Sequence, residues 1–126
     1  LNGCVISWYN VIDLNEVARR TGKPLICVTY EPSPGLEEYF KRYFPTDWEE
    51  RLAIYERNGP RKAVELRTGH RVFIRAIGMD EEEAKKVLDK FTLHGSIPEP
   101  LRLARLLARA VLSGLVELSE AKINLR

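Results

Sequence analysis

The side chains best suited to chemistry lie in two short stretches, one near each end of the chain. In the first stretch, Asn2, Asn10 and Asp13 surround an apolar run that predicts a strand, and Asn10 and Asp13 follow that run. In open α/β sheets, ligands bind outside the carboxyl ends of the strands. The pattern therefore predicts a polar binding site there, although a helix cap at Asp13 and a turn at Asn10 explain the same residues without a ligand.

The second stretch begins a predicted helix at Pro98, with Glu99 and Arg102 in its first turns. A helix N-terminus attracts phosphate, and Arg102 can hold a phosphate group with two N–H donors. Arg102, Arg105 and Arg109 recur at i, i+3 and i+7, so they share one face that can follow a phosphate backbone. Two simpler explanations stay open: Glu99 complements the helix dipole, and the arginines form a solvated helix face.

A strand, a helix and a second strand must position the first group. Residues 1–9 are enriched in β-branched and aromatic side chains, which predicts a strand. A cap at Asp13 and a stop at Gly22 bound a helix over residues 14–21. The apolar run 24–30 predicts a strand buried on both faces. Short links between these elements predict a βαβ unit with parallel strands.

The remaining pattern alternates helices with one hairpin. It predicts helices over 36–43 and from a capping box at Thr46–Glu49 to about Arg57, and then a hairpin of 62–67 with 71–77. Asp80 and Glu83 open a helix that runs to about Phe91, and the last helix is expected to end at Gly114.

Composition narrows the class of protein. A chain of 126 residues with 44% hydrophobic residues predicts a single domain over 1–126. The balance of 20 basic against 18 acidic residues gives a net charge of +2, so any nucleic-acid surface must come from local clustering. The sequence shows no membrane span or secretory signal, and its two cysteines form no C-x-x-C pair. We expect a cytoplasmic protein with no membrane partner.

The first residues, Leu1-Asn2-Gly3-Cys4, start within a predicted strand and without a methionine. Two expectations follow from this beginning. Either a further N-terminal part lies outside this sequence, or the protein is an unusually short member of its family.

Two segments carry a resemblance to a known family. They resemble blocks of the archaeal endonuclease dU family, which is distantly similar to endonuclease V. The two segments are residues 1–30, LNGCVISWYNVIDLNEVARRTGKPLICVTY, and residues 95–108, GSIPEPLRLARLLA. The Pro-Glu-Pro-Leu-Arg string is the most specific piece. The similarity spans nearly the whole chain and matches the C-terminal two-thirds of such a protein.

The resemblance implies an α/β fold: a ribonuclease H-like mixed sheet flanked by helices, without its N-terminal strands. It also implies Mg²⁺-dependent cleavage of DNA that carries a deaminated base such as deoxyuridine, with carboxylates holding the ion. On this basis the expected catalytic residues are Asn2, Asp13 and Glu99, the metal ligands are Asp13 and Glu99, and the residues that bind nucleic acid are Asn10, Arg102, Arg105 and Arg109.

Two positions depart from the family pattern. Asn2 stands where endonuclease V has an aspartate, and Arg105 stands where the endonuclease dU family usually has a histidine. The magnesium ligand set is therefore incomplete in this chain. The alternative function is a non-catalytic module that binds nucleic acid or protein on a degenerate nuclease fold. A homo-oligomer formed through an open sheet edge is a further expectation.

Overall fold

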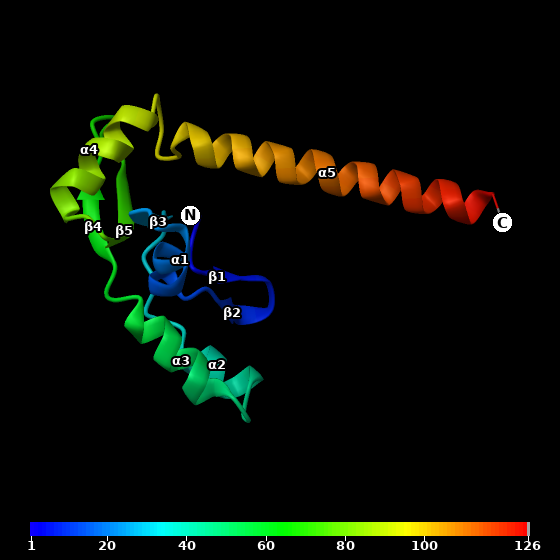
Figure 1. The fold of residues 1–126 in the computed structure, drawn as a ribbon, viewed down its shortest axis with the longest axis horizontal. Coiled ribbons are helices and arrows are strands. Elements are labelled where there is room, and N and C mark those ends of the chain that lie inside the picture. Colours follow the sequence, from blue (N-terminus) through cyan, green and yellow to red (C-terminus); the bar gives the residue numbers. More distant parts are fainter. Residues whose placement is uncertain (126) are drawn as a thin grey trace.

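A mixed sheet forms the centre of the molecule, and one long helix projects from it (Figure 1). The computed structural model describes residues 1–125. Strands β3 (Leu25–Thr29), β5 (Arg71–Ile77) and β4 (Lys62–Glu65) pair antiparallel in the order β3-β5-β4. Along the other side of β3, Asn2 forms a parallel bridge with Val28. The predicted α/β class with a mixed sheet is confirmed.

The N-terminal residues turn back on themselves, so the predicted single strand over 1–9 is wrong. Strands β1 (Val5–Ile6) and β2 (Asn10–Val11) form a small hairpin whose turn is the 3₁₀ segment η1 (Ser7–Tyr9). Trp8 and Tyr9 adopt positive φ angles of 58° and 55°, which reverse the chain. An apolar and aromatic composition cannot reveal such a reversal, because it favours extended structure in general.

Helix α1 (Leu14–Thr21) connects this hairpin to β3. Asp13 caps its first turn, and Gly22 ends it in the left-handed conformation, at φ 63°. Asn2 bridges Val28 in parallel, so the start of the chain and β3 run in the predicted common direction with α1 between them, although the first strand is reduced to this bridge and the β1–β2 hairpin is inserted before α1. Cys27 packs with Leu14 of α1, whereas the neighbouring Val28 faces the opposite side of the sheet.

Helices α2 (Glu37–Tyr43) and α3 (Trp48–Arg57) form a pair below the sheet in Figure 1. The predicted capping box of Thr46 and Glu49 is absent, because the N-cap position of α3 is Asp47. The Asp47 carboxylate binds Arg51 at 2.9 Å instead of a backbone N–H. Phe40 is fully buried and meets the Tyr55 ring edge-on at 5.9 Å. These two rings therefore pack α2 against α3.

Helix α4 (Glu81–Phe91) covers the face of the sheet opposite α1, with Ala84 and Leu88 against Val28 and Ile74. Its capping box of Asp80 and Glu83 is present as predicted. Helix α5 (Glu99–Asn124) continues through Gly114, so the expected end there is wrong. A glycine inside a helix costs only about 1 kcal/mol relative to alanine, and helix-forming residues surround this one. No helix in residues 1–125 is long and apolar enough to cross a membrane.

Candidate functional site

Asn2 lies on the outer side of β3, at an edge of the sheet. Its backbone neighbours hold it there, since Gly3 N–H donates to Val28 O at 2.9 Å and Val28 N–H donates to Leu1 O at 2.8 Å. The Asn2 side chain is exposed and lines a hollow of about 300 Å³. Asn2, which was predicted to be catalytic, therefore lies beside a cavity.

Asn10 and Asp13 are occupied by partners within the protein. Asn10 Nδ2 donates to Ser7 O at 2.8 Å, and its Oδ1 accepts from Arg51 Nη1 at 3.3 Å. Asp13 Oδ1 accepts from the N–H groups of Asn15 and Glu16, each at 3.1 Å, and Oδ2 accepts from Arg57 Nη2 at 3.1 Å.

These partners stabilise the charged form of Asp13. The N–H of Glu16 is the main cause that lowers the pKa of the carboxyl group, and Arg57 adds to it. A metal ion at Asp13 would have to compete with the helix cap and with a guanidinium. Asp13 thus has a structural function as a helix cap. A metal ion could bind Asp13 only by sharing its carboxylate with that cap and with Arg57.

Glu99 forms an ion pair with Arg102 at the start of α5. Arg102 Nη2 and Nε reach Glu99 Oε2 at 2.6 and 2.9 Å, and this contact holds the pKa of Glu99 below its ordinary value. One turn further, Arg105 is close enough to Tyr30 to oppose the rise in the Tyr30 pKa that burial causes. Arg109 is exposed on the projecting part of α5.

The predicted acidic ligands do not gather into a metal site. Among residues 1–125, no group of three or more His, Cys, Asp and Glu side chains is arranged to hold a metal ion. Asp13 and Glu99 are each paired with an arginine instead. The residues of this part of the chain therefore do not fit a magnesium ion by themselves.

A buried polar cluster beneath α1 was not anticipated as a site. It consists of Cys4, Cys27, Asn58 and Arg75, each at most 6% exposed. Asn58 Nδ2 donates to Ile12 O, and its Oδ1 accepts from Leu14 N–H, both at 2.8 Å, so it joins the end of α3 to the start of α1.

Arg75 is the charged member of this cluster. Its Nε donates to Gly59 O at 2.7 Å, Nη1 lies 3.6 Å from Cys4 Sγ, and the guanidinium stands 5.0 Å from the centre of the Tyr55 ring. One signal for this site was available in the sequence. Alternation along residues 71–77 puts Arg75 on the same face as the apolar Phe73 and Ile77, where a charge is unusual.

The cluster changes the acidity of its thiols. A hydrogen bond from Cys27 is the largest effect on Cys4, and with the Arg75 guanidinium it lowers the Cys4 pKa to about 6, against the effect of burial. The hydrogen bond with Cys4 is likewise the main cause that raises the pKa of Cys27, followed by burial. Cys4 is therefore the thiol of the pair that ionises first.

The fold and the site together define a mixed α/β domain with an arginine-lined hollow next to the outer edge of its sheet. The chain belongs to the endonuclease dU family, whose model matches residues 1–112. It is 36% identical over 110 residues to a UPF0215 protein of Pyrobaculum aerophilum, covering 87% of this chain and 59% of that protein. A UPF0215 protein of Pyrococcus furiosus is 37% identical over 116 residues, covering 90% of this chain and 58% of that protein.

A solved structure supports the fold. The crystal structure of a protein of unknown function from Archaeoglobus fulgidus superimposes with a TM-score of 0.72 at 28% identity, covering 88% of this chain and 61% of that chain. This chain thus spans about three-fifths of the length of the curated relatives described above.

Proposed function

We propose that this chain is part of an endonuclease domain that cleaves DNA at a deaminated base, deoxyuridine in particular. The observation that carries the proposal is the match to the endonuclease dU family over residues 1–112. That match supports a nuclease-like role at the level of the family. The deaminated base and a role in DNA repair are the finer parts of the proposal.

Magnesium dependence is a separate part of the proposal. Since residues 1–125 gather no three-ligand group, Asp13 and Glu99 can serve a metal ion only together with acidic groups beyond those residues. The contribution that we assign to this chain is to bind and orient the nucleic acid. Arg102, Arg105 and Arg109 on α5 are the residues proposed to contact phosphates, with Asn10 near the hairpin.

Cleavage of a labelled oligonucleotide tests the proposal. The substrate carries one deoxyuridine, the control strand carries thymidine at that position, and each is incubated with Mg²⁺ or with a chelator. We expect cutting of the deoxyuridine strand only, with Mg²⁺ only. Glu99→Gln should slow cutting at least tenfold, whereas Glu117→Gln, which removes an equal charge from the same helix, should leave the rate unchanged. Equal cutting of both strands would contradict the proposed specificity.

A second candidate function is a non-catalytic module that binds nucleic acid. It is favoured by the ion pairs that engage both Asp13 and Glu99 and by the missing three-ligand group. The expected result is binding without cutting, with an affinity that falls as salt rises. Arg105→Gln should reduce the slope of log K against log salt by about 1 if that residue contacts one phosphate. A slope near zero would exclude this function.

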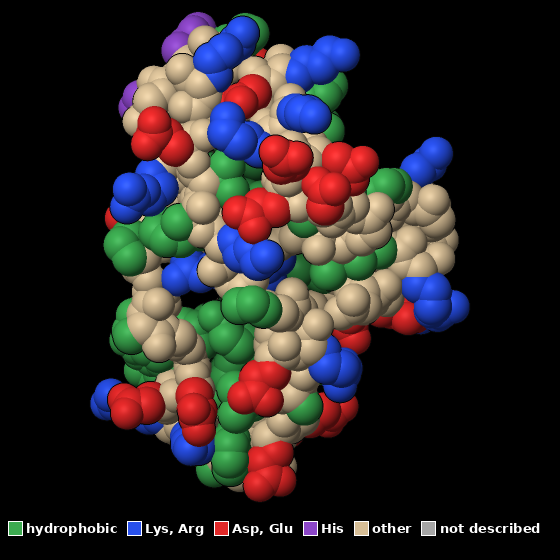
Figure 2. Space-filling model, turned by 90° about the vertical axis from the view of Figure 1, so that its left-hand side faces the viewer, with side chains coloured by type: hydrophobic (Ala, Val, Ile, Leu, Met, Phe, Trp, Pro, Cys, Tyr) green, Lys and Arg blue, Asp and Glu red, His purple; other side chains and the backbone are tan. Residues whose placement is uncertain are grey.

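The charge on the surface bears on where nucleic acid binds. Over the face shown in Figure 2, acidic and basic side chains are interspersed, and no continuous basic area covers it. The arginines of α5 are therefore better candidates than that face. We also propose a cytoplasmic location, which the free thiols of Cys4 and Cys27 support.

A further inference from the structure

We propose that the hollow beside Asn2 binds a phosphate group, held by the guanidinium groups of Arg61 and Arg75. The hollow has a volume of about 300 Å³ and lies between the edge of β3, the loop that follows it and the end of α3. A neighbouring hollow shares Ser33, Tyr55 and both arginines with it, so the two cavities meet at the guanidinium groups. In naming nucleic acid as the source of the phosphate, the inference rests on the proposed function.

Arg75 is a buried cation without a carboxylate partner. It is 94% buried, and no carboxylate in residues 1–125 lies within ion-pair distance of it. Gly59 O and Cys4 Sγ take up Nε and Nη1, which leaves Nη2 without a hydrogen-bond partner in the described residues. Burying a guanidinium is costly unless a counter-charge accompanies it. A Cys4 thiolate beside Arg75 would offset one of the two guanidinium charges at the hollow, and a bound anion would offset the other.

Arg61 is the second cation, and neutral oxygens fix its orientation. Its Nη1 donates to Thr29 Oγ1 at 3.1 Å and to Glu31 O at 2.9 Å, and its Nη2 donates to Ser33 O at 3.2 Å. These acceptors position the guanidinium without cancelling its charge. The residues described contain no ion pair to Arg61 either. Two ordered guanidinium groups at one cavity match the geometry of phosphate recognition.

The wall of the hollow also contains the amide of Asn2. The buried hydroxyl group of Tyr30, which has no hydrogen-bond partner, belongs to the other face of the sheet, because Tyr30 packs with Val28 and not with Cys27. The hollow thus combines two cations with one neutral amide.

The rival explanation is that the Cys4 thiolate alone is the counter-charge at the hollow and that no anion binds. Titration of the full chain with inorganic phosphate, observed through the Nε–H signals of arginine in ¹H–¹⁵N NMR spectra, separates the two. We expect saturable shifts of the Arg61 and Arg75 signals and at least tenfold weaker binding in Arg61→Gln. Arg71→Gln removes the same charge from the exposed start of β5 and should bind as the unaltered protein does.

Three further ligands identify the source of the phosphate. Deoxyuridine monophosphate should shift the same signals, and deoxyuridine without its phosphate should not. A short single-stranded oligonucleotide that competes with inorganic phosphate would assign the site to nucleic acid. If phosphate bound but the oligonucleotide did not compete with it, the hollow would be an anion site whose ligand is not nucleic acid.

The absence of any shift at Arg61 and Arg75 up to millimolar phosphate would overturn the inference, as would equal binding by Arg61→Gln. Arg75→Lys is a second variant, and its backbone spectrum shows directly whether it folds. The test does not depend on cleavage. Failure of the deoxyuridine assay with intact phosphate binding would refute the proposed function alone.

Discussion

At the scale of single residues, Cys4 is distinguished by a buried thiol whose pKa is lowered. Because its pKa is lowered to about 6 from an ordinary value of 9.0, we expect a thiolate at neutral pH. Absorbance at 240 nm should rise with a midpoint near pH 6 in the folded protein. The rise should vanish in Cys4→Ser, and in Cys27→Ala its midpoint should move toward 9, because Cys27 provides the hydrogen bond that most lowers the Cys4 pKa and alanine has no donor. A midpoint above 8 in the unaltered protein would contradict this.

The same pKa predicts how stability depends on pH. The unfolded chain keeps its Cys4 proton up to about pH 9, whereas the folded chain loses it near pH 6, so the free energy of unfolding should rise with pH between these values. The contribution is complete above the unfolded pKa and is lost as the pH falls through 6. Urea unfolding at pH 6, 7 and 8 measures the slope, and Cys4→Ser should flatten it. If Cys4→Ser showed the same slope as the unaltered protein, the pH dependence of stability would come from another titrating group.

Asp13 allows its structural and catalytic roles to be separated. Asp13→Asn keeps a good helix cap, whereas Asp13→Ala loses it and should cost about 1 kcal/mol of stability. If Asp13 also holds a metal ion, Asp13→Asn should abolish cleavage while its unfolding curve stays close to that of the unaltered protein. Full activity in Asp13→Asn would leave Asp13 as a cap only.

Residue patterns revealed some of these features but not others. Asp13 as a cap, Gly22 as a stop and the Asp80–Glu83 box are local signals, and the structure contains all three. The Arg75 cluster depends on Cys4 and Asn58, which are far from Arg75 in sequence. No local pattern brings such residues together, because the sheet and the end of α3 have to form first.

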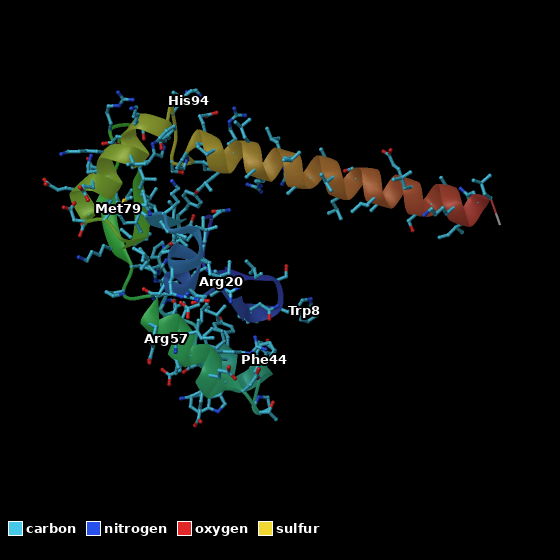
Figure 3. The ribbon with its side chains drawn as sticks, in the orientation of Figure 1. Trp8, Arg20, Phe44, Arg57, Met79 and His94 are labelled. Atoms are coloured by element: carbon cyan, nitrogen blue, oxygen red, sulfur yellow. The ribbon has the colours of Figure 1, made fainter. Side chains whose placement is uncertain are left out.

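At the scale of elements, the β1–β2 hairpin combines exposure with backbone strain. Trp8 is at the tip of this hairpin and points away from the body (Figure 3). It is 85% exposed and has a φ of 58°, which costs an L-residue about 1–2 kcal/mol. Trp8→Gly should therefore stabilise the protein by roughly 1 kcal/mol, since glycine adopts this conformation freely and little packing is lost. Urea unfolding measures the change.

A matched control is available in the same hairpin. Ile6 is also more than half exposed, but its backbone is extended, at φ −104° and ψ −170°. Ile6→Gly should therefore destabilise the protein, because glycine relieves no strain there and adds disorder to the unfolded chain. If both glycine variants destabilised the protein alike, the strain at Trp8 would not be real.

The order of elements was largely predictable, whereas their ends and turns were less so. Periodicity and caps predicted five helices close to their observed positions and the hairpin of β4 with β5. The turn at Trp8 and the passage of α5 through Gly114 were missed. Both depend on weak local preferences, because a positive φ at Trp8 and a glycine inside a helix each cost only about 1–2 kcal/mol.

At the scale of the whole molecule, α5 exposes a large apolar surface that the rest of the described structure does not cover. Only the start of the helix packs on the body, through Leu101, and the helix of 26 residues then projects for much of its length of about 39 Å (Figure 1). Glu117 is the one charged residue from Ala110 to Ser119. The large exposed apolar side chains on α5 are Leu103, Leu106, Leu107, Val111, Leu112, Leu115, Val116, Leu118 and Ile123.

A helix that is apolar on most sides is stable in water only when something covers it. We therefore expect the isolated 126-residue chain to self-associate through α5, with pairing at the sheet edge beside Asn2 as the alternative contact. Sedimentation velocity at rising concentration should show a dimer or a larger species. Leu112→Glu should shift the protein toward monomer, because it puts a charge into the apolar surface.

Ser119→Glu is the control for that variant, because it adds the same charge to the same helix and removes no apolar side chain. It should sediment as the unaltered chain does, which separates lost apolar contact from general charge repulsion. A chain that stays monomeric at high concentration while α5 remains helical would show that this surface needs no partner. If the chain still associated in Leu112→Glu, the free edge of the sheet would be the better candidate for the contact.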